Sequence, residues 1–217
     1  MRRSLRTPAG CRIMKNSQIT FLQNVRAPDQ FSTTTLDAAL KSIKDKTYKI
    51  QIDYIRTLTD KNALKAAKLK LPCVIFTGTF TGKTTHENLT TTSGVVVMDI
   101  DELPKDSTLE EVKQTICALP YVIFCFLSPT GRGFKVGVRV DPGAVPLTYG
   151  LKEDQQRQAK EKFTKLWGSI RDEFVAQGLK VDESCKDRCV ESGQHCLRPQ
   201  NRYATIMGGS LAALSCW

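Results

Sequence analysis

The segment that most constrains the fold is residues 93–103, which read Ser-Gly-Val-Val-Val-Met-Asp-Ile-Asp-Glu-Leu. The run of apolar, mostly β-branched residues predicts a buried strand. Side chains alternate along a strand, so we expect Asp99 and Asp101 on one face of it. Met98 and Ile100 take the opposite face. The chain must therefore place two neighbouring carboxylates where a core strand ends.

Two interpretations of this acidic pair are open. Adjacent carboxylates repel each other unless a cation neutralises them, and hard cations such as Mg²⁺ or Mn²⁺ prefer carboxylate oxygens. The pair therefore favours a metal site. The alternative is that the two aspartates only mark the entry into a solvated turn, because so short a motif often occurs by chance.

The composition fits one globular domain with a polyanionic partner. The 217 residues are 41% hydrophobic and 25% charged, which suffices for a core. Lys and Arg number 32 against 22 Asp and Glu, a formal net charge of +10 that favours nucleic acid as a partner. No apolar run approaches the ~18 residues of a membrane span, so no membrane partner is expected.

The cysteines and the N-terminus indicate a cytoplasmic protein. Eight cysteines without a secretory signal predict reduced thiols, and Cys73, Cys117 and Cys125 are expected to be small core side chains. Residues 1–17 are expected to be a disordered basic extension, with Met14 as the natural start. The alternative is a basic arm that touches DNA.

Helical patterns occupy much of the first half of the chain. Residues 36–43 and 61–69 predict helices, and residues 48–58 predict a helix or a short strand. Ser107 and Glu110 have the spacing of a capping box that opens another helix. Three basic residues of this half are candidates for phosphate contacts, although such residues are more often ordinary solvated charges: Arg56, Lys65 and Lys70.

A glycine-containing loop at residues 77–85 resembles a P-loop but does not have its spacing. Three residues separate Gly78 from Gly82, whereas a Walker A loop has four between its glycines. A strand rather than a helix is expected after it. We therefore expect a mobile polar hairpin tip.

Residues 121–140 predict an antiparallel hairpin closed by a glycine-rich loop, Ser128-Pro-Thr-Gly-Arg-Gly133. The glycines permit positive φ and allow a phosphate to approach backbone amides. Alternation predicts Lys135 and Arg139 on one open face of the second strand. The alternative is a solvated hairpin with a polar face and no ligand.

The last regular elements bring a third acidic position. Residues 152–176 predict a long helix with an apolar stripe. Residues 179–183 predict a short strand that ends at Asp182 and Glu183. Three carboxylates at strand ends, with a basic hairpin between them, suggest a common site.

These segments resemble the archaeo-eukaryotic primase superfamily. They are most similar to the VirE N-terminal-type domain, a primase-polymerase-like module of Bacteroides-type mobile-element proteins. That family has a D-x-D strand, an S-P-S-G-x-G-x-K hairpin and a later Asp. Asp99 and Asp101 match the first, residues 128–135 (Ser-Pro-Thr-Gly-Arg-Gly-Phe-Lys) the second and Asp182 the third. The resemblance covers residues 18–187, and the superfamily usually carries His where this chain has Lys135.

The resemblance implies an α+β fold, a mostly antiparallel sheet flanked by helices with an RRM-like half. It implies template-directed nucleotidyl transfer in plasmid or mobile-element DNA replication, with single-stranded DNA and nucleoside triphosphates as partners. Asp99, Asp101 and Asp182 would be catalytic and hold Mg²⁺ or Mn²⁺. The expected nucleotide-binding residues are Ser128, Gly131, Arg132, Gly133 and Lys135, and those expected to contact nucleic acid are Arg56, Lys65 and Arg139.

Other interpretations stay open. The domain could bind single-stranded nucleic acid without catalysis, or be an inactive fragment of a protein that works with a helicase. Residues 188–217 depart from the family pattern and are expected to be an aberrant, poorly packed tail. A zinc site from Cys185, Cys189, His195 and Cys196 is the alternative for that tail, although its spacing is irregular.

Overall fold

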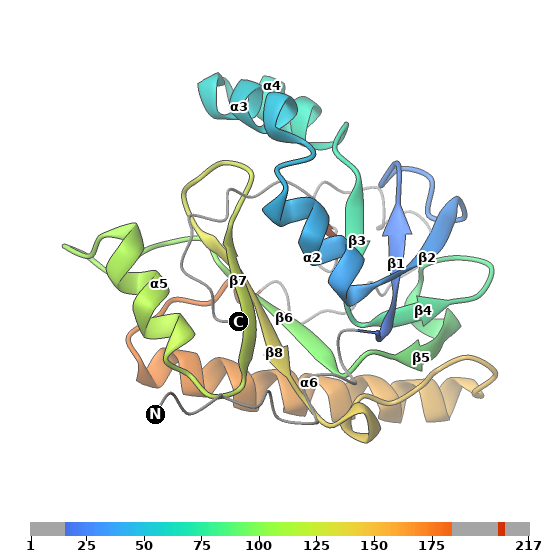
Figure 1. Cartoon of the computed structure of the whole chain (residues 1–217). Coiled ribbons are helices and arrows are strands. Elements are labelled where there is room, and N and C mark those ends of the chain that lie inside the picture. The colour runs from blue at the N-terminus through green and yellow to red at the C-terminus, as the bar shows by residue number, and fades with distance from the viewer. Residues whose placement is uncertain (1–15, 184–203, 207–217) are drawn as a thin grey trace, which may run out of the picture.

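The structure is a computed structural model that describes residues 16–183 and the backbone of residues 204–206. Within that part, helices pack around three small antiparallel sheets, which is an α+β fold (Figure 1). The strand orders are β2-β1-β3-β9, β4-β5 and β6-β8-β7. The strands are β1 Gln18–Leu22, β2 Phe31–Thr35, β3 Cys73–Ile75, β4 Gly78–Phe80, β5 Leu89–Thr92, β6 Val95–Ile100, β7 Val122–Leu127, β8 Phe134–Arg139 and β9 Ala204–Ile206.

The helices follow the apolar periodicity of the sequence. The α-helices are α2 Leu36–Lys44, α3 Lys49–Thr57, α4 Lys61–Lys68, α5 Leu109–Cys117 and α6 Glu153–Ala176, and two 3₁₀ turns are η1 His86–Asn88 and η2 Pro142–Ala144. The ambiguous segment before Leu58 is therefore a helix. None of the described helices combines the length and the apolar character needed to cross a bilayer.

The β6-β8-β7 sheet is buried on both faces. One face carries Met98 and Val136 and packs against α5 and α6, which contribute the buried side chains Val112, Ile116, Phe163, Trp167, Ile170 and Phe174. In Figure 1, α6 runs along this side of the sheet. The opposite face carries Val95, Phe124 and Phe126 and packs against α2, β1 and β3. The end of β6 is thus fixed by a core on each side.

This second core corrects the expectation of an open basic face on β8. Gly137 is buried there, and a Cβ at its position would lie 2.2 Å from the ring of Phe124. The missing side chain lets the aromatic ring lie directly on the sheet. Lys135 is half-buried and Arg139 alone is exposed. The sequence pattern identified the face correctly but could not show that α2 covers it.

Helices α3 and α4 form a small hairpin with its own core. Ile52, Ile55 and Leu71 are buried together there, apart from the two larger clusters. In Figure 1 this hairpin lies at the same end of the molecule as the loop between β7 and β8.

The capping box of α5 is shifted by one residue from the expected position. Thr108, not Ser107, is the N-cap: its hydroxyl accepts the Glu111 N–H at 3.2 Å, and its own N–H donates to the Glu111 carboxylate at 2.8 Å. These bonds lower the pKa of Glu111, the backbone bond most strongly. Asp106, with φ of 63°, turns the chain just before the cap.

We predict that Thr108→Ala lowers the free energy of unfolding by about 1 kcal/mol at neutral pH, the usual contribution of such a cap. Glu111 has a lowered pKa in the folded state, so its bonds contribute at neutral pH and are lost as the pH falls through that lowered pKa. The difference between wild type and variant should therefore narrow in acid. Urea unfolding at several pH values measures it.

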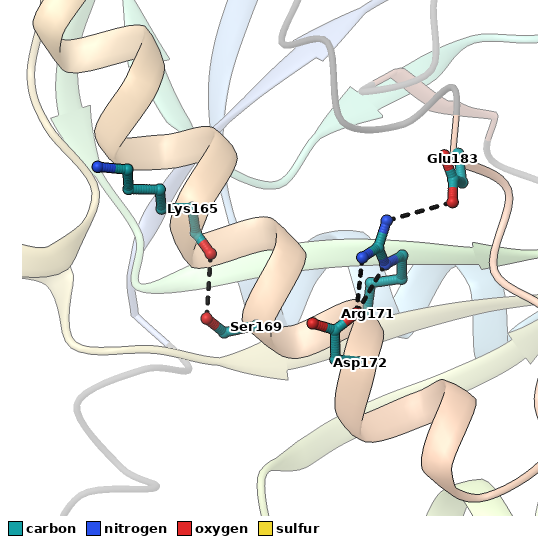
Figure 2. Close-up of polar contacts among 5 residues, drawn as sticks. All are labelled: Lys165, Ser169, Arg171, Asp172 and Glu183. Atoms are coloured by element: carbon teal, nitrogen blue, oxygen red, sulfur yellow. Dashed lines mark hydrogen bonds and ion pairs between the residues drawn. The ribbon is translucent and has the colours of Figure 1, made fainter.

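Ser169→Ala is the matched control for this prediction. The Ser169 hydroxyl donates to the Lys165 carbonyl oxygen at 3.1 Å, within the exposed surface of α6 (Figure 2). It caps no helix end, so its removal should change stability by less than about 0.5 kcal/mol at every pH. A loss for Thr108→Ala that is no larger than the control's would contradict the capping role.

The remaining expectations have mixed outcomes. The segment 77–85 is a hairpin connection rather than a P-loop, and Thr84 is buried with its N–H donating to the Pro28 carbonyl at 3.0 Å. Cys73 and Cys125 are buried core side chains as predicted, and burial raises the pKa of Cys125 to about 12. Cys117 is only partly buried and packs against the core on the α5 side of the sheet.

Two predictions concern the ends of the chain. Backbone residues 204–206 pair with β3, with Val74 opposite Thr205. The rest of the expected tail, the four candidate zinc ligands and the expected extension up to residue 15 lie outside the described residues. Those expectations stay predictions.

Candidate metal and phosphate site

Three aspartates converge where β6 ends. One carboxylate oxygen from each of Asp99, Asp101 and Asp182 lies within 4.8 Å of the other two. Asp99 is the second-last residue of β6 and is 7% exposed. Asp101 follows the strand and is exposed. The three residues therefore converge as expected. Asp99 is buried, Asp182 half-buried and Asp101 exposed, so solvent reaches the group from the side of Asp101.

Asp182 is held in this group by its backbone and its neighbours. Its N–H donates to the Asp99 carbonyl oxygen at 2.8 Å. The preceding Lys180 forms a bridge with Glu102, by backbone pairing and by an ion pair. This segment is a single bridge rather than the short strand that the sequence predicted, but it is enough to align Asp182 with the end of β6.

A second ion pair fastens the same segment to α6. The guanidinium of Arg171 donates to Glu183 at 3.2 Å and to Asp172 at 2.7 Å (Figure 2). Glu183 therefore points toward α6 while Asp182 belongs to the acidic group. Lys180 and Arg171 were not predicted as positioning residues. Lys180 is a basic residue two positions before Asp182, whereas the pairing of Arg171 with Glu183 depends on how α6 packs.

Lys135 lies directly beside Asp99 on the neighbouring strand. The two residues are register partners on β8 and β6, and the Lys135 ammonium donates to Oδ2 of Asp99. Their side chains are only 17% and 10% exposed, so solvent screens this ion pair weakly. Oδ1 of Asp99 is buried and has no hydrogen-bond partner within the described part of the chain. A buried carboxylate oxygen left in this state is destabilising unless another group binds it.

The glycine-rich loop packs directly onto the acidic strand. Gly133 is buried, and a Cβ at its position would lie 2.0 Å from the Ile100 carbonyl oxygen and 2.9 Å from the Cα of Asp101. Only glycine allows this close approach. The Ser128 N–H donates to the Gly133 carbonyl at 2.8 Å and closes the loop, while Gly131 has φ of +72°. The loop and the carboxylates thus form one structural unit.

Arg56 reaches this loop from α3. Its Nε donates to the Pro129 carbonyl oxygen at 3.3 Å, and the same atom lies 3.3 Å from where a Cβ of Gly131 would be. The nucleic-acid contact expected of Arg56 stays a prediction. Its position places a guanidinium beside the candidate phosphate-binding loop, 73 residues away in the chain.

The other expected contact residues lie apart from the acidic group. Arg139 is exposed at the opposite end of β8 from Lys135, four residues along the strand and so about 13 Å away. Lys65 is exposed on α4. Arg132 is exposed in the loop itself, where its side chain can meet a ligand.

Comparison with known proteins gives one assignment. The model of the BT4734-like, N-terminal domain family matches residues 66–190, more than half of the chain. The chain belongs to this family. The matched part of the BT4734-like domain includes all three aspartates, Lys135 and the glycine-rich loop, and it begins within α4. No curated protein and no solved structure matches the chain.

Proposed function

We propose that this domain is a metal-dependent nucleotidyltransferase of the primase-polymerase type, acting on single-stranded DNA and nucleoside triphosphates in the cytoplasm. The observation that carries the proposal is the group of three carboxylates beside a glycine-rich loop and a half-buried lysine. The motif resemblance supports the same reaction and suggests a role in plasmid or mobile-element replication, alongside a helicase.

The donor set of the acidic group fits Mg²⁺ or Mn²⁺. It consists of carboxylate oxygens, and Oδ1 of Asp99 is buried without a hydrogen-bond partner among the described residues. Asp99, Asp101 and Asp182 would hold the metal. When bound, such an ion lowers the pKa of an attacking hydroxyl and neutralises charge on the transferred phosphoryl group.

The protein's own groups would orient the nucleotide. The Lys135 ammonium, now paired with Asp99, could instead bind a phosphate oxygen of the nucleotide as a point charge. The guanidinium of Arg56 and the exposed Arg132 place two more cations at the loop. The backbone of the loop, with Gly131 at positive φ, can present N–H groups to a triphosphate.

A non-catalytic single-strand-binding module is the second candidate. The ion pair between Lys135 and Asp99 favours it, because the ammonium already supplies a cation to the buried carboxylate. In that case the aspartates would serve stability, and the basic surface would bind nucleic acid alone.

A primer-extension assay separates these candidates. The wild-type protein, a primed single-stranded template and labelled nucleotides are incubated with Mg²⁺, with Mn²⁺ or with EDTA, and a second set omits the primer. Metal-dependent products support the proposal. If neither metal gives products or measurable nucleotide binding, while single strands still bind, the non-catalytic candidate replaces it.

A further inference from the structure

Within the residues that the structure describes, positive charge is concentrated in one small part of the fold; residues 1–15, which lie outside them, carry a further formal +5. Residues 44–70, which include α3 and α4, contain eight Lys or Arg and three Asp, a formal +5 of the chain's +10. By contrast, the much longer α6 carries five residues of each sign. An excess this localised marks a polyanion-binding surface more clearly than net charge alone does.

The three aspartates of residues 44–70 pair with groups other than the lysine side chains of α4. Asp45 pairs with Lys41, and Asp53 pairs with Lys49. Asp60 is the N-cap of α4 and accepts the Ala63 N–H at 2.8 Å. Each acid is therefore engaged locally.

The lysines of α4 form one stripe. Lys61, Lys65 and Lys68 are spaced by four and three residues, which places them on one side of the helix. The stripe is about 10 Å long at the rise of an α-helix. Leu64 and Ala67 lie beside the stripe and pack into the hairpin core. Lys61 and Lys65 are exposed and Lys68 is half-buried, so the stripe faces solvent along most of its length.

A groove adjoins the end of this helix. It encloses about 380 Å³ and is lined by Gln23, Asn24, Arg26, Ala66, Leu69 and Lys70. It combines an apolar wall, two amides and two cations. This is the chemistry that a single nucleotide needs, with its base on the apolar wall and its phosphate between the cations.

We propose that the lysine stripe of α4 and this groove bind a single strand of nucleic acid, with one unpaired nucleotide in the groove. Single strands fit better than a duplex because the groove offers space for one base outside a stack. The contact between Arg56 and Pro129 joins the hairpin to the glycine-rich loop. This binding does not depend on the proposed function; only a further assignment of the bound strand as the template would rest on it.

The test measures binding without catalysis. Fluorescence anisotropy of a labelled oligo(dT) strand is recorded in EDTA, over a range of salt concentrations, for the full chain. The triple variant Lys61→Glu, Lys65→Glu, Lys68→Glu should bind at least about tenfold more weakly. The triple glutamine variant should reduce the slope of log affinity against log salt by roughly 2, the value for three lost phosphate contacts on a single strand.

A matched control changes the same charge elsewhere. Arg157→Glu, Lys162→Glu, Lys165→Glu alters three exposed cations of α6, and Figure 2 shows the Lys165 ammonium directed away from that helix. This control should bind within threefold of wild type. Ala66→Trp, which fills the groove without changing charge, should weaken binding several-fold and leave the salt slope unchanged. Circular dichroism checks that each variant is folded.

The outcomes separate this proposal from the proposed function. Three results would overturn it. The α4 triple variant could bind the strand as tightly as wild type, it could lose no more affinity than the α6 triple variant, or the α4 lysines could bind a duplex more tightly than a single strand. Intact strand binding in a protein without nucleotide incorporation would leave this surface in place and remove only the polymerase role.

Discussion

Asp101→Ala and Asp99→Asn are each expected to lower metal-dependent nucleotide incorporation by roughly a hundredfold or more. Each change removes one of the three proposed carboxylate ligands, and a metal that stabilises developing charge contributes several kcal/mol, at about 1.4 kcal/mol for each factor of ten. Asn is chosen at position 99 because its amide oxygen can still accept a hydrogen bond from the half-buried Lys135 ammonium, whereas Ala offers no acceptor. Single-turnover extension with Mn²⁺ measures the loss.

The binding of Mn²⁺ itself provides an independent measurement of the same effect. Electron paramagnetic resonance of free Mn²⁺ should show weaker binding in both variants. Glu102→Ala is the matched control, because it removes only the exposed ion pair with Lys180 and leaves the backbone bridge that aligns Asp182 in place. It should keep most of the activity, since exposed pairs contribute little stability. Full activity in Asp101→Ala would contradict the proposed metal site at the end of β6.

Gly133→Ala is expected to have the second-largest effect. The added methyl group would lie 2.0 Å from the Ile100 carbonyl oxygen, so either the loop or the end of β6 must shift. We expect a loss of roughly 3 kcal/mol or more in the free energy of unfolding, the upper range for overpacking in a rigid site. Urea unfolding measures this loss, and Mn²⁺ binding should fall with it because Asp101 moves.

Gly168→Ala is the matched control for Gly133→Ala. Gly168 lies in α6, and nothing lies within 4 Å of a Cβ at its position. Alanine favours helix more than glycine does, so this change should stabilise the protein by about 0.5–1 kcal/mol. If Gly133→Ala instead unfolds at the wild-type urea concentration, the loop does not pack on the acidic strand as described.

The local patterns of the sequence predicted the elements that carry the site. Alternation placed Asp99 opposite Met98 and Ile100 correctly, and the glycine-rich hairpin between β7 and β8 is confirmed. The capping box was wrong by one residue because Ser107 with Glu110 and Thr108 with Glu111 have the same spacing. Only the backbone turn at Asp106 decides between them.

Relations between distant segments could not be predicted in the same way. Lys135 pairs with Asp99 because β8 lies between β6 and β7, and no local pattern fixes that strand order. The covering of the Gly137 face by α2 and the contact of Arg56 with the loop likewise depend on tertiary packing. Convergence of the three aspartates was expected from their positions at strand ends and from the family resemblance, and the structure supplies the bridge at Lys180 that aligns the third.

The central position of β8 also restricts how the gene can change in length. Phe134 and Val136 belong to the core, and Lys135 between them reaches Asp99. Inserting one codon between Gly133 and Lys135 would reverse the sidedness of the strand, sending an ammonium into the apolar layer over α6 and a phenylalanine toward the carboxylates. Divergence by insertion or deletion is therefore compatible with the connection around η2 and incompatible with this short interval.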